Sequence, residues 1–143
     1  MAYQKLQASR LLAVIPSNSV DIPNSGAVAQ SGSTTAGTAN KLTDADGDFI
    51  NKRVKVGDIV YAGTVAATVT AIDSASVLST SATIPNSTAY VIYSQTDNPQ
   101  NGCALYCGGS GDISVTTMSG DTVVLSAVPA GLFIPINSVK RVN

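Results

Sequence analysis

The side chains most capable of chemistry lie in one short acidic stretch, Asp44-Ala45-Asp46-Gly47-Asp48. Three carboxylates at alternate positions suggest a cation site, because hard cations prefer oxygen ligands. A calcium-binding EF-hand loop has glycine at its sixth position and glutamate at its twelfth. Counting from Asp44, the glycine is fourth and the twelfth residue is Lys55. The stretch therefore favours a solvated turn, with loose binding of a cation as the alternative.

The two cysteines, Cys103 and Cys107, are the next candidates. On one straight strand they point the same way but lie about 13 Å apart, beyond the roughly 7 Å between Cα atoms that a disulfide spans. A zinc site needs more ligands, and the chain has no histidine to supply them. We therefore expect two reduced, packed thiols, with a disulfide or a metal site as lesser alternatives.

Catalytic groups are scarce. Without histidine there is no Ser-His-Asp triad and no Cys-His pair, and all nine acids are aspartates. The Gly108-Gly109-Ser110-Gly111 run is followed by a strand-like sequence, whereas a phosphate-binding loop requires a helix at that point. The sequence predicts no enzymatic activity, no catalytic residues, no cofactor and no metal site.

Composition favours a component of an assembly. Hydrophobic residues make up 44% of the chain but charged residues only 12%, about half of the usual charged fraction. A surface of Ser, Thr and Asn protects poorly against self-association. The net charge of −1 suggests no nucleic-acid partner. The longest early apolar run, Leu11 to Ile15, is too short for a signal sequence or a membrane helix, so no membrane association is expected.

The elements that would carry these residues are β-strands separated by turns. Residues 104–107, 112–118 and 122–128 read as strands, the last two joined by a Ser119-Gly120-Asp121 hairpin. Pro129-Ala130-Gly131 predicts another turn before a last strand, 132–142.

The preceding chain divides into three parts. Residues 1–25 predict an N-terminal arm and two short strand candidates, at 11–15 and 20–23, which the flanking prolines keep at a sheet edge or in a loop. Residues 26–40 read as a flexible or extended linker. Residues 41–100 predict a β-unit of four or five short strands. Within it, 54–60 reads as strand, turn and strand, and 65–72 places Val65, Ala67, Val69 and Ala71 on one face. The fold class is therefore all-β, with a small sandwich or barrel formed by both termini (1–25 and 101–143) and a second barrel-like domain inserted.

Motifs at the two ends resemble a known family. The strings A-L-Y-C-G-G-S-G-D-I-S-V (104–115), G-D-T-V (120–123), V-P-A-G (128–131) and P-S-N-S-V-D-I-P (16–23) resemble small structural proteins of tailed phages. These are described as spike-base proteins, with relatives among head and tail decoration proteins. In that family the proline phrase lies only a few residues before the A-L-Y strand, whereas here about eighty residues separate them. The middle therefore looks like an insertion.

The resemblance implies a virion protein without enzymatic activity. We expect capsid decoration or cementing, as a homotrimer bound to the major capsid protein or another virion protein. The alternative is a component of the spike base, tail or vertex. A rival hypothesis from the residues is that the inserted domain binds a host glycan, with Tyr61, Tyr90 and Tyr93 as stacking platforms. Since an extended strand puts Tyr90 and Tyr93 on opposite faces, we expect at least one of these tyrosines in the core.

Overall fold

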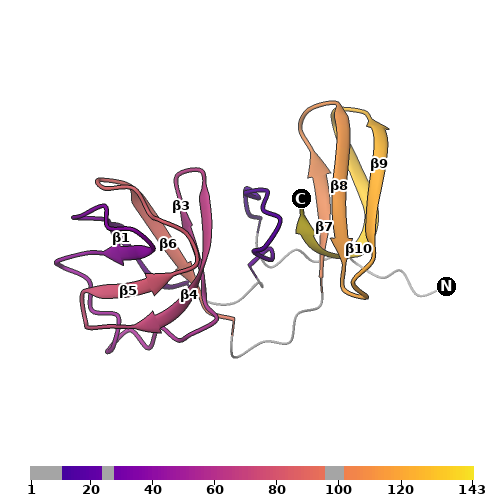
Figure 1. Ribbon diagram of the computed structural model, residues 1–143. Helices are drawn as coiled ribbons and strands as arrows, with labels where there is room; N and C mark the ends of the chain where they lie inside the picture. Colours follow the sequence, from indigo (N-terminus) through magenta and orange to yellow (C-terminus); the bar gives the residue numbers. More distant parts are fainter. Residues whose placement is uncertain (1–10, 24–27, 96–101) are drawn as a thin grey trace.

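The computed structural model describes residues 11–23, 28–95 and 102–143, and the described residues contain no helix. Ten strands form two antiparallel sheets that stand side by side (Figure 1). The predicted all-β fold class is confirmed. The predicted N-terminal arm (1–10) and most of the segment between the sheets (96–101) lie outside the described residues.

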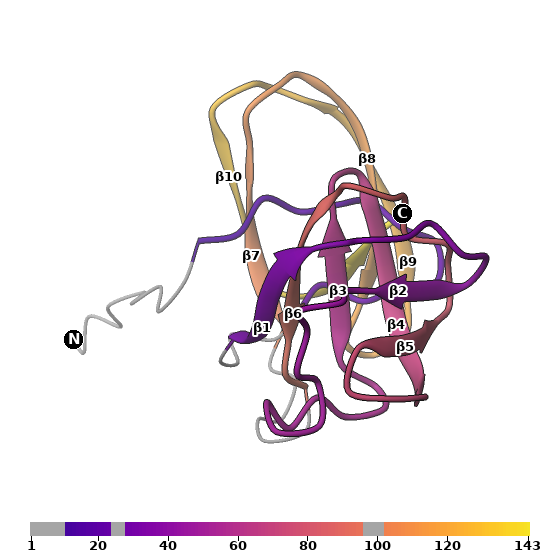
Figure 2. The same cartoon turned by 90° about the vertical axis from the view of Figure 1, so that its left-hand side faces the viewer.

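The first sheet has six strands in the order β1-β6-β3-β4-β5-β2. Its bounds are β1 Val28–Ser33, β2 Lys41–Thr43, β3 Ile59–Ala62, β4 Val65–Ile72, β5 Val77–Thr80 and β6 Ala89–Tyr93. A bridge between Ala36 and Thr43, with a hydrogen bond from the Thr35 amide to the Thr43 carbonyl (2.8 Å), joins the two ends of this sheet. The sheet therefore curls into a barrel-like shape, seen from its outer side in Figure 2.

Side chains on the inner face of this barrel form its core. The alternation predicted for 65–72 is confirmed, because Ala67 and Val69 are buried and Val65 is partly buried against the same cluster. The chain between β2 and β3 covers one part of this core with Phe49, which packs against Tyr90 with ring centroids 6.3 Å apart. Residues 54–56, predicted as a strand, belong instead to this irregular connection, and only the second half of the predicted pair forms a strand, β3.

The prediction of a linker at 26–40 is wrong, because β1 lies within it. Gln30 to Ser33 pair with Ile92 to Ala89 of β6. The main chain makes these bonds whatever its side chains are, so a run of small polar residues gave no hydrophobic alternation to detect. Gly32 is required here by space, since it lies against the side chains of Asp44 and Tyr90. The inserted domain therefore begins at β1 and not at residue 41.

Replacing Gly32 with alanine is expected to lower the free energy of unfolding by about 1–3 kcal/mol. An added Cβ would lie 2.6 Å from Asp44 Oδ2 and 2.9 Å from the Tyr90 hydroxyl, which share a buried hydrogen bond. Gly108→Ala is the control, because no atom lies within 4 Å of a Cβ built there. Chemical denaturation of the two variants measures the difference, and equal midpoints would contradict this packing.

The second sheet has four strands in the order β7-β10-β8-β9. Its bounds are β7 Cys103–Cys107, β8 Gly111–Thr117, β9 Thr122–Val128 and β10 Leu132–Val142. All four strands were predicted, and β8 and β9 form the predicted hairpin. One face of the sheet carries the second core, which includes Leu105, Val115 and Val139.

Residues 11–23 form no strand, so the strand candidates at 11–15 and 20–23 are wrong and the loop alternative is correct. Proline lacks an amide hydrogen, and Pro16 and Pro23 bound a stretch that makes only scattered main-chain bonds. Two of these bonds reach the last strand, from the Ser17 amide to the Val142 carbonyl and from the Ile22 amide to the Lys140 carbonyl, both 2.8 Å. The segment runs between the two sheets (Figure 1). We call residues 11–23 the strap.

Candidate functional site

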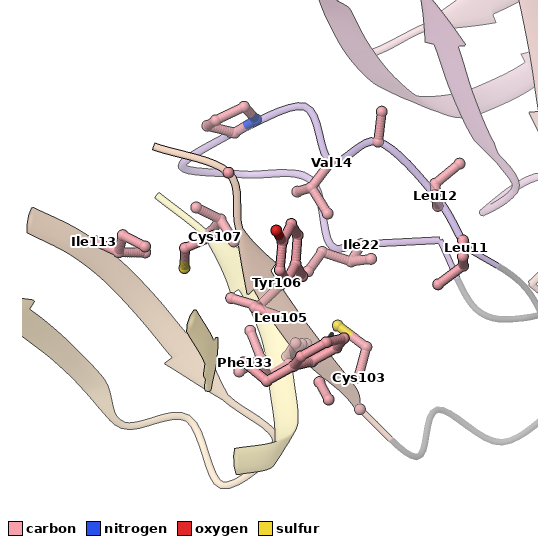
Figure 3. A pocket seen from close by; sticks show the side chains of 18 of the residues that line it. Leu11, Leu12, Val14, Ile22, Cys103, Leu105, Tyr106, Cys107, Ile113 and Phe133 are labelled. Atoms are coloured by element: carbon pink, nitrogen blue, oxygen red, sulfur yellow. Dashed lines mark hydrogen bonds between the residues drawn. The ribbon is translucent and has the colours of Figure 1, made fainter. Parts of the chain in front are cut away.

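An apolar groove of about 970 Å³ lies between the strap and β7 (Figure 3). The strap lines one side with residues 11–14, Pro16 and residues 22–23, and residues 102–109 line the other. Phe133 of β10 also lines it, beside β7. The groove is a concave apolar surface on which a partner could bind.

Two apolar contacts hold the strap in place. Val20 is buried against the outer face of the first sheet, in a cluster with Ile59, Tyr61 and Tyr93. Ile22 is buried on the other side, in the core of the second sheet. Since neighbouring residues of the strap contact different sheets, the strap connects the two sheets by hydrophobic burial.

Ion pairs join the strap to the last strand. Asp21 Oδ1 accepts hydrogen bonds from Arg141 Nη2 at 2.7 Å and from Arg141 Nε at 3.0 Å. Lys140 Nζ lies 3.5 Å from Asp21 Oδ2, and Arg141 Nη1 donates to the Asn18 carbonyl at 2.9 Å. A guanidinium that donates through two nitrogens fixes the direction of its partner, so this contact sets the register of the strap on β10.

Tyr61 lies at the contact between the strap and the first sheet. Its hydroxyl is hydrogen-bonded to the main chain of Ile15, and burial raises its pKa to about 12. Since burial favours the neutral phenol, stability is expected to hold below pH of about 10, the ordinary pKa of tyrosine, and to fall between about 10 and 12.

Tyr61→Phe is expected to make this alkaline loss of stability shallower. The slope of the unfolding free energy against pH should decrease by the equivalent of about one proton. Tyr90, whose pKa is also raised by burial and by its bond to Asp44, remains in the variant and accounts for the rest. Urea midpoints measured from pH 8 to 11.5 test this expectation. Parallel pH profiles for the two proteins would show that Tyr61 ionises as freely in the fold as in the unfolded chain.

An aromatic pair stands exposed beside the groove. Tyr106 and Phe133 are 60% and 65% exposed, and their ring centroids lie 5.1 Å apart. The two residues are directly paired across β7 and β10. Leu11, at the strap end of the groove, is 88% exposed. Neighbouring exposed apolar side chains of this size commonly mark an interaction surface.

Both cysteines lie on β7 as free thiols, as predicted. Cys107 is buried in the core of the second sheet, and Cys103 is packed against that core. Burial raises the pKa of the Cys103 thiol, whose sulfur lies 3.4 Å from the Val139 carbonyl oxygen and donates to it. A thiol held neutral is a poor nucleophile, so Cys103 contributes packing, and Cys107 contributes packing through its burial in the core.

The acidic stretch forms the predicted turn, with Asp46 exposed, but the turn is only partly solvated because Asp44 is buried. Its carboxylate accepts the Tyr90 hydroxyl at 2.7 Å and the Asp46 amide at 3.1 Å. Asp48 accepts the side-chain amide of Asn51 at 2.9 and 3.0 Å. Across 11–23, 28–95 and 102–143, no three His, Cys, Asp or Glu side chains are grouped so as to hold a metal ion.

Asp58 is a second buried acid, and no sequence motif marks it as a candidate site. Its carboxylate accepts the Lys55 amide at 2.8 Å and the Gln95 amide at 3.0 Å. These bonds fasten the connection before β3 to the end of β6. The only indication of Asp58 in the sequence is its place in a Val56-Gly57-Asp58 stretch of turn-forming residues.

The structure does not support the three proposed glycan-stacking tyrosines. Tyr90 is in the core of the first sheet, which confirms that at least one of them is buried. Tyr61 and Tyr93 are buried beneath the strap, with ring centroids 5.7 Å apart. A stacking platform needs an open ring face, and none of the three offers one.

Searches of known protein families, of curated proteins and of solved structures found no match to this chain. In the part of the chain that the structure describes, no helix has the length and hydropathy needed to cross a membrane.

Proposed function

We propose that this chain is a non-enzymatic structural protein of a phage virion that decorates or cements the capsid surface. Its partner is the major capsid protein or another virion protein, and it acts as a homotrimer. The terminal β-domain, made of the strap and the second sheet, docks on the particle. The first sheet projects from it.

The observation that carries this proposal is where the family-like motifs lie. The proline phrase at 16–23 contacts the last strand through the Ser17 and Ile22 amides and through Asp21 with Arg141. The A-L-Y strand is β7 of the same sheet. Motifs separated by about eighty residues thus form one domain, as the resemblance to spike-base and decoration proteins implies.

The surface supports the same proposal. The apolar groove and the Tyr106–Phe133 pair lie on the terminal domain, and a chain with 12% charged residues offers few charges to oppose close packing with a neighbour. The resemblance extends equally to spike-base proteins, so a role in the spike base, tail or vertex is the second candidate.

Rebinding to depleted particles tests the proposal. Phage particles assembled without this protein are incubated with the purified chain and sedimented. We expect saturable binding that Phe133→Lys weakens and Val56→Lys leaves unchanged, because both side chains are exposed but only Phe133 is on the terminal domain. Absence of binding would refute the virion role, and equal loss in both variants would refute docking through the terminal domain.

A further inference from the structure

The groove runs along an open edge of the second sheet. The side chains of β7 alternate between the core face, with Leu105 and Cys107, and the solvent face, with Ala104 and Tyr106. Residues of both faces line the groove, which happens only if the groove follows the edge of the strand. Among the described residues, β7 pairs with β10 alone. Its other edge therefore offers unpaired main-chain groups to the groove.

The groove is long enough for a short extended segment. Residues 102–109 line one side of it, and eight extended residues at about 3.3 Å each span about 26 Å. A strand of about eight residues can therefore lie along β7.

The exposed aromatic pair supplies only part of the area that an interface between folded proteins needs. A fully buried aromatic side chain covers about 150–250 Å², so Tyr106 and Phe133 together expose about 200–300 Å². A stable interface between folded proteins needs about 800 Å² on each partner. An extended segment gains main-chain hydrogen bonds along the strand edge as well as these side-chain contacts.

We propose that this groove binds residues 1–10 of a second copy of the chain as an added β-strand. Ten residues of the sequence precede Leu11, the residue with which the strap enters the groove. Ten extended residues reach about 33 Å, enough to cross from one copy to another. The inference concerns association of the protein with itself and does not rest on the proposed virion role.

The sequence of residues 1–10, M-A-Y-Q-K-L-Q-A-S-R, matches the groove. In an extended chain Ala2, Leu6 and Ala8 share one side with Gln4, and this mostly apolar side suits the core face of β7. Tyr3 lies on the other side, which suits the exposed aromatic pair. The segment carries two positive charges and no acid. The remaining 133 residues carry six positive and nine negative charges, so their net charge is −3 and favours its approach.

The segment that binds the groove is better supplied by a second copy than by the same chain. To bind its own groove, the segment would have to reverse direction directly before Leu11, which lines the groove with the rest of the strap. Residues 1–10 contain no Gly, Pro, Asn or Asp to make so tight a turn. Exchange between copies requires no reversal.

The first test compares the full chain with a chain that lacks residues 2–10, by size-exclusion chromatography with light scattering. We expect the full chain to form oligomers and the shortened chain to be monomeric. A full chain that is monomeric at about 100 µM, far above the dissociation constants of most specific complexes, would overturn the exchange. So would a shortened chain that still forms the same oligomer.

The second test uses a fluorescent synthetic peptide of residues 1–10 and measures its anisotropy with the shortened chain. Tyr106→Lys is expected to weaken binding about tenfold or more, whereas Val124→Lys, a side chain on β9 with the same 60% exposure, has no effect. Circular dichroism verifies that both variants fold. Equal effects of the two substitutions would place the peptide elsewhere.

N-methylated peptides distinguish an added strand from simple apolar contact. Alternate amides of a strand point to opposite edges. We therefore expect methylation of one set (residues 3, 5 and 7, or residues 4, 6 and 8) to abolish binding and methylation of the other set to preserve it. If both methylated peptides bind like the unmodified one, strand addition is refuted. None of these tests measures binding to virions, so a negative result refutes the strand exchange without refuting the proposed virion role.

Discussion

Phe49→Ala is expected to lower the free energy of unfolding by about 3–5 kcal/mol, the range for removing a buried aromatic side chain. Phe49 is fully buried in the core of the first sheet, although it lies in the irregular connection between β2 and β3. Its amide donates to the Ala75 carbonyl at 2.9 Å, and its ring contacts Tyr90. The substitution leaves a cavity that this fixed main chain cannot close.

The adjacent residue supplies the control. Ile50 is exposed, so Ile50→Ala is expected to change the free energy of unfolding by less than about 0.5 kcal/mol. Guanidinium denaturation followed by circular dichroism measures both variants. Similar losses for Phe49→Ala and Ile50→Ala would mean that the connection does not cover the core of the first sheet.

Ile22→Ala is expected to destabilise the terminal domain by about 2–5 kcal/mol. Ile22 is the strap residue buried in the core of the second sheet, where it joins Leu105 and Val139. Because Val20 still contacts the first sheet, that sheet should keep its stability. Amide hydrogen exchange resolves the two parts, with faster exchange expected in β8 and β10 and unchanged exchange in β4.

Leu11→Ala is the matched control on the same strap. Its side chain is almost fully exposed, so little packing is lost and exchange should be unchanged in both sheets. If Ile22→Ala also left exchange in β8 and β10 unchanged, the strap would not belong to the core of the terminal domain.

The elements that the sequence predicts best are those with a clear period or strong turn residues. The alternation at 65–72 and the Ser119-Gly120-Asp121 hairpin each specify their structure locally. β1 could not be found in this way, because Gln30 to Ser33 have little hydrophobicity and pair through the main chain. The strand candidate at 11–15 failed for the opposite reason, since Leu12, Val14 and Ile15 pack against two sheets without forming a strand.

The groove could not be predicted from local sequence patterns. It depends on the strap reaching β7 across about eighty residues of inserted chain, and no short-range pattern predicts that distance. Only the family-like motifs at the two ends indicated that these parts would meet. The burial of Asp44 likewise depends on Tyr90, which is 46 residues away in sequence. A local pattern of three carboxylates could not distinguish such a residue from a solvated one.

The copy number of this protein per purified particle tests the virion role most directly, measured by quantitative mass spectrometry against the major capsid protein. Closed symmetric assemblies carry their components in fixed numbers, so the ratio identifies the location. We predict hundreds of copies, as capsid decoration requires. A few copies to a few dozen would place the protein at the spike base, tail or a vertex, and its absence from the particle would contradict the structural role.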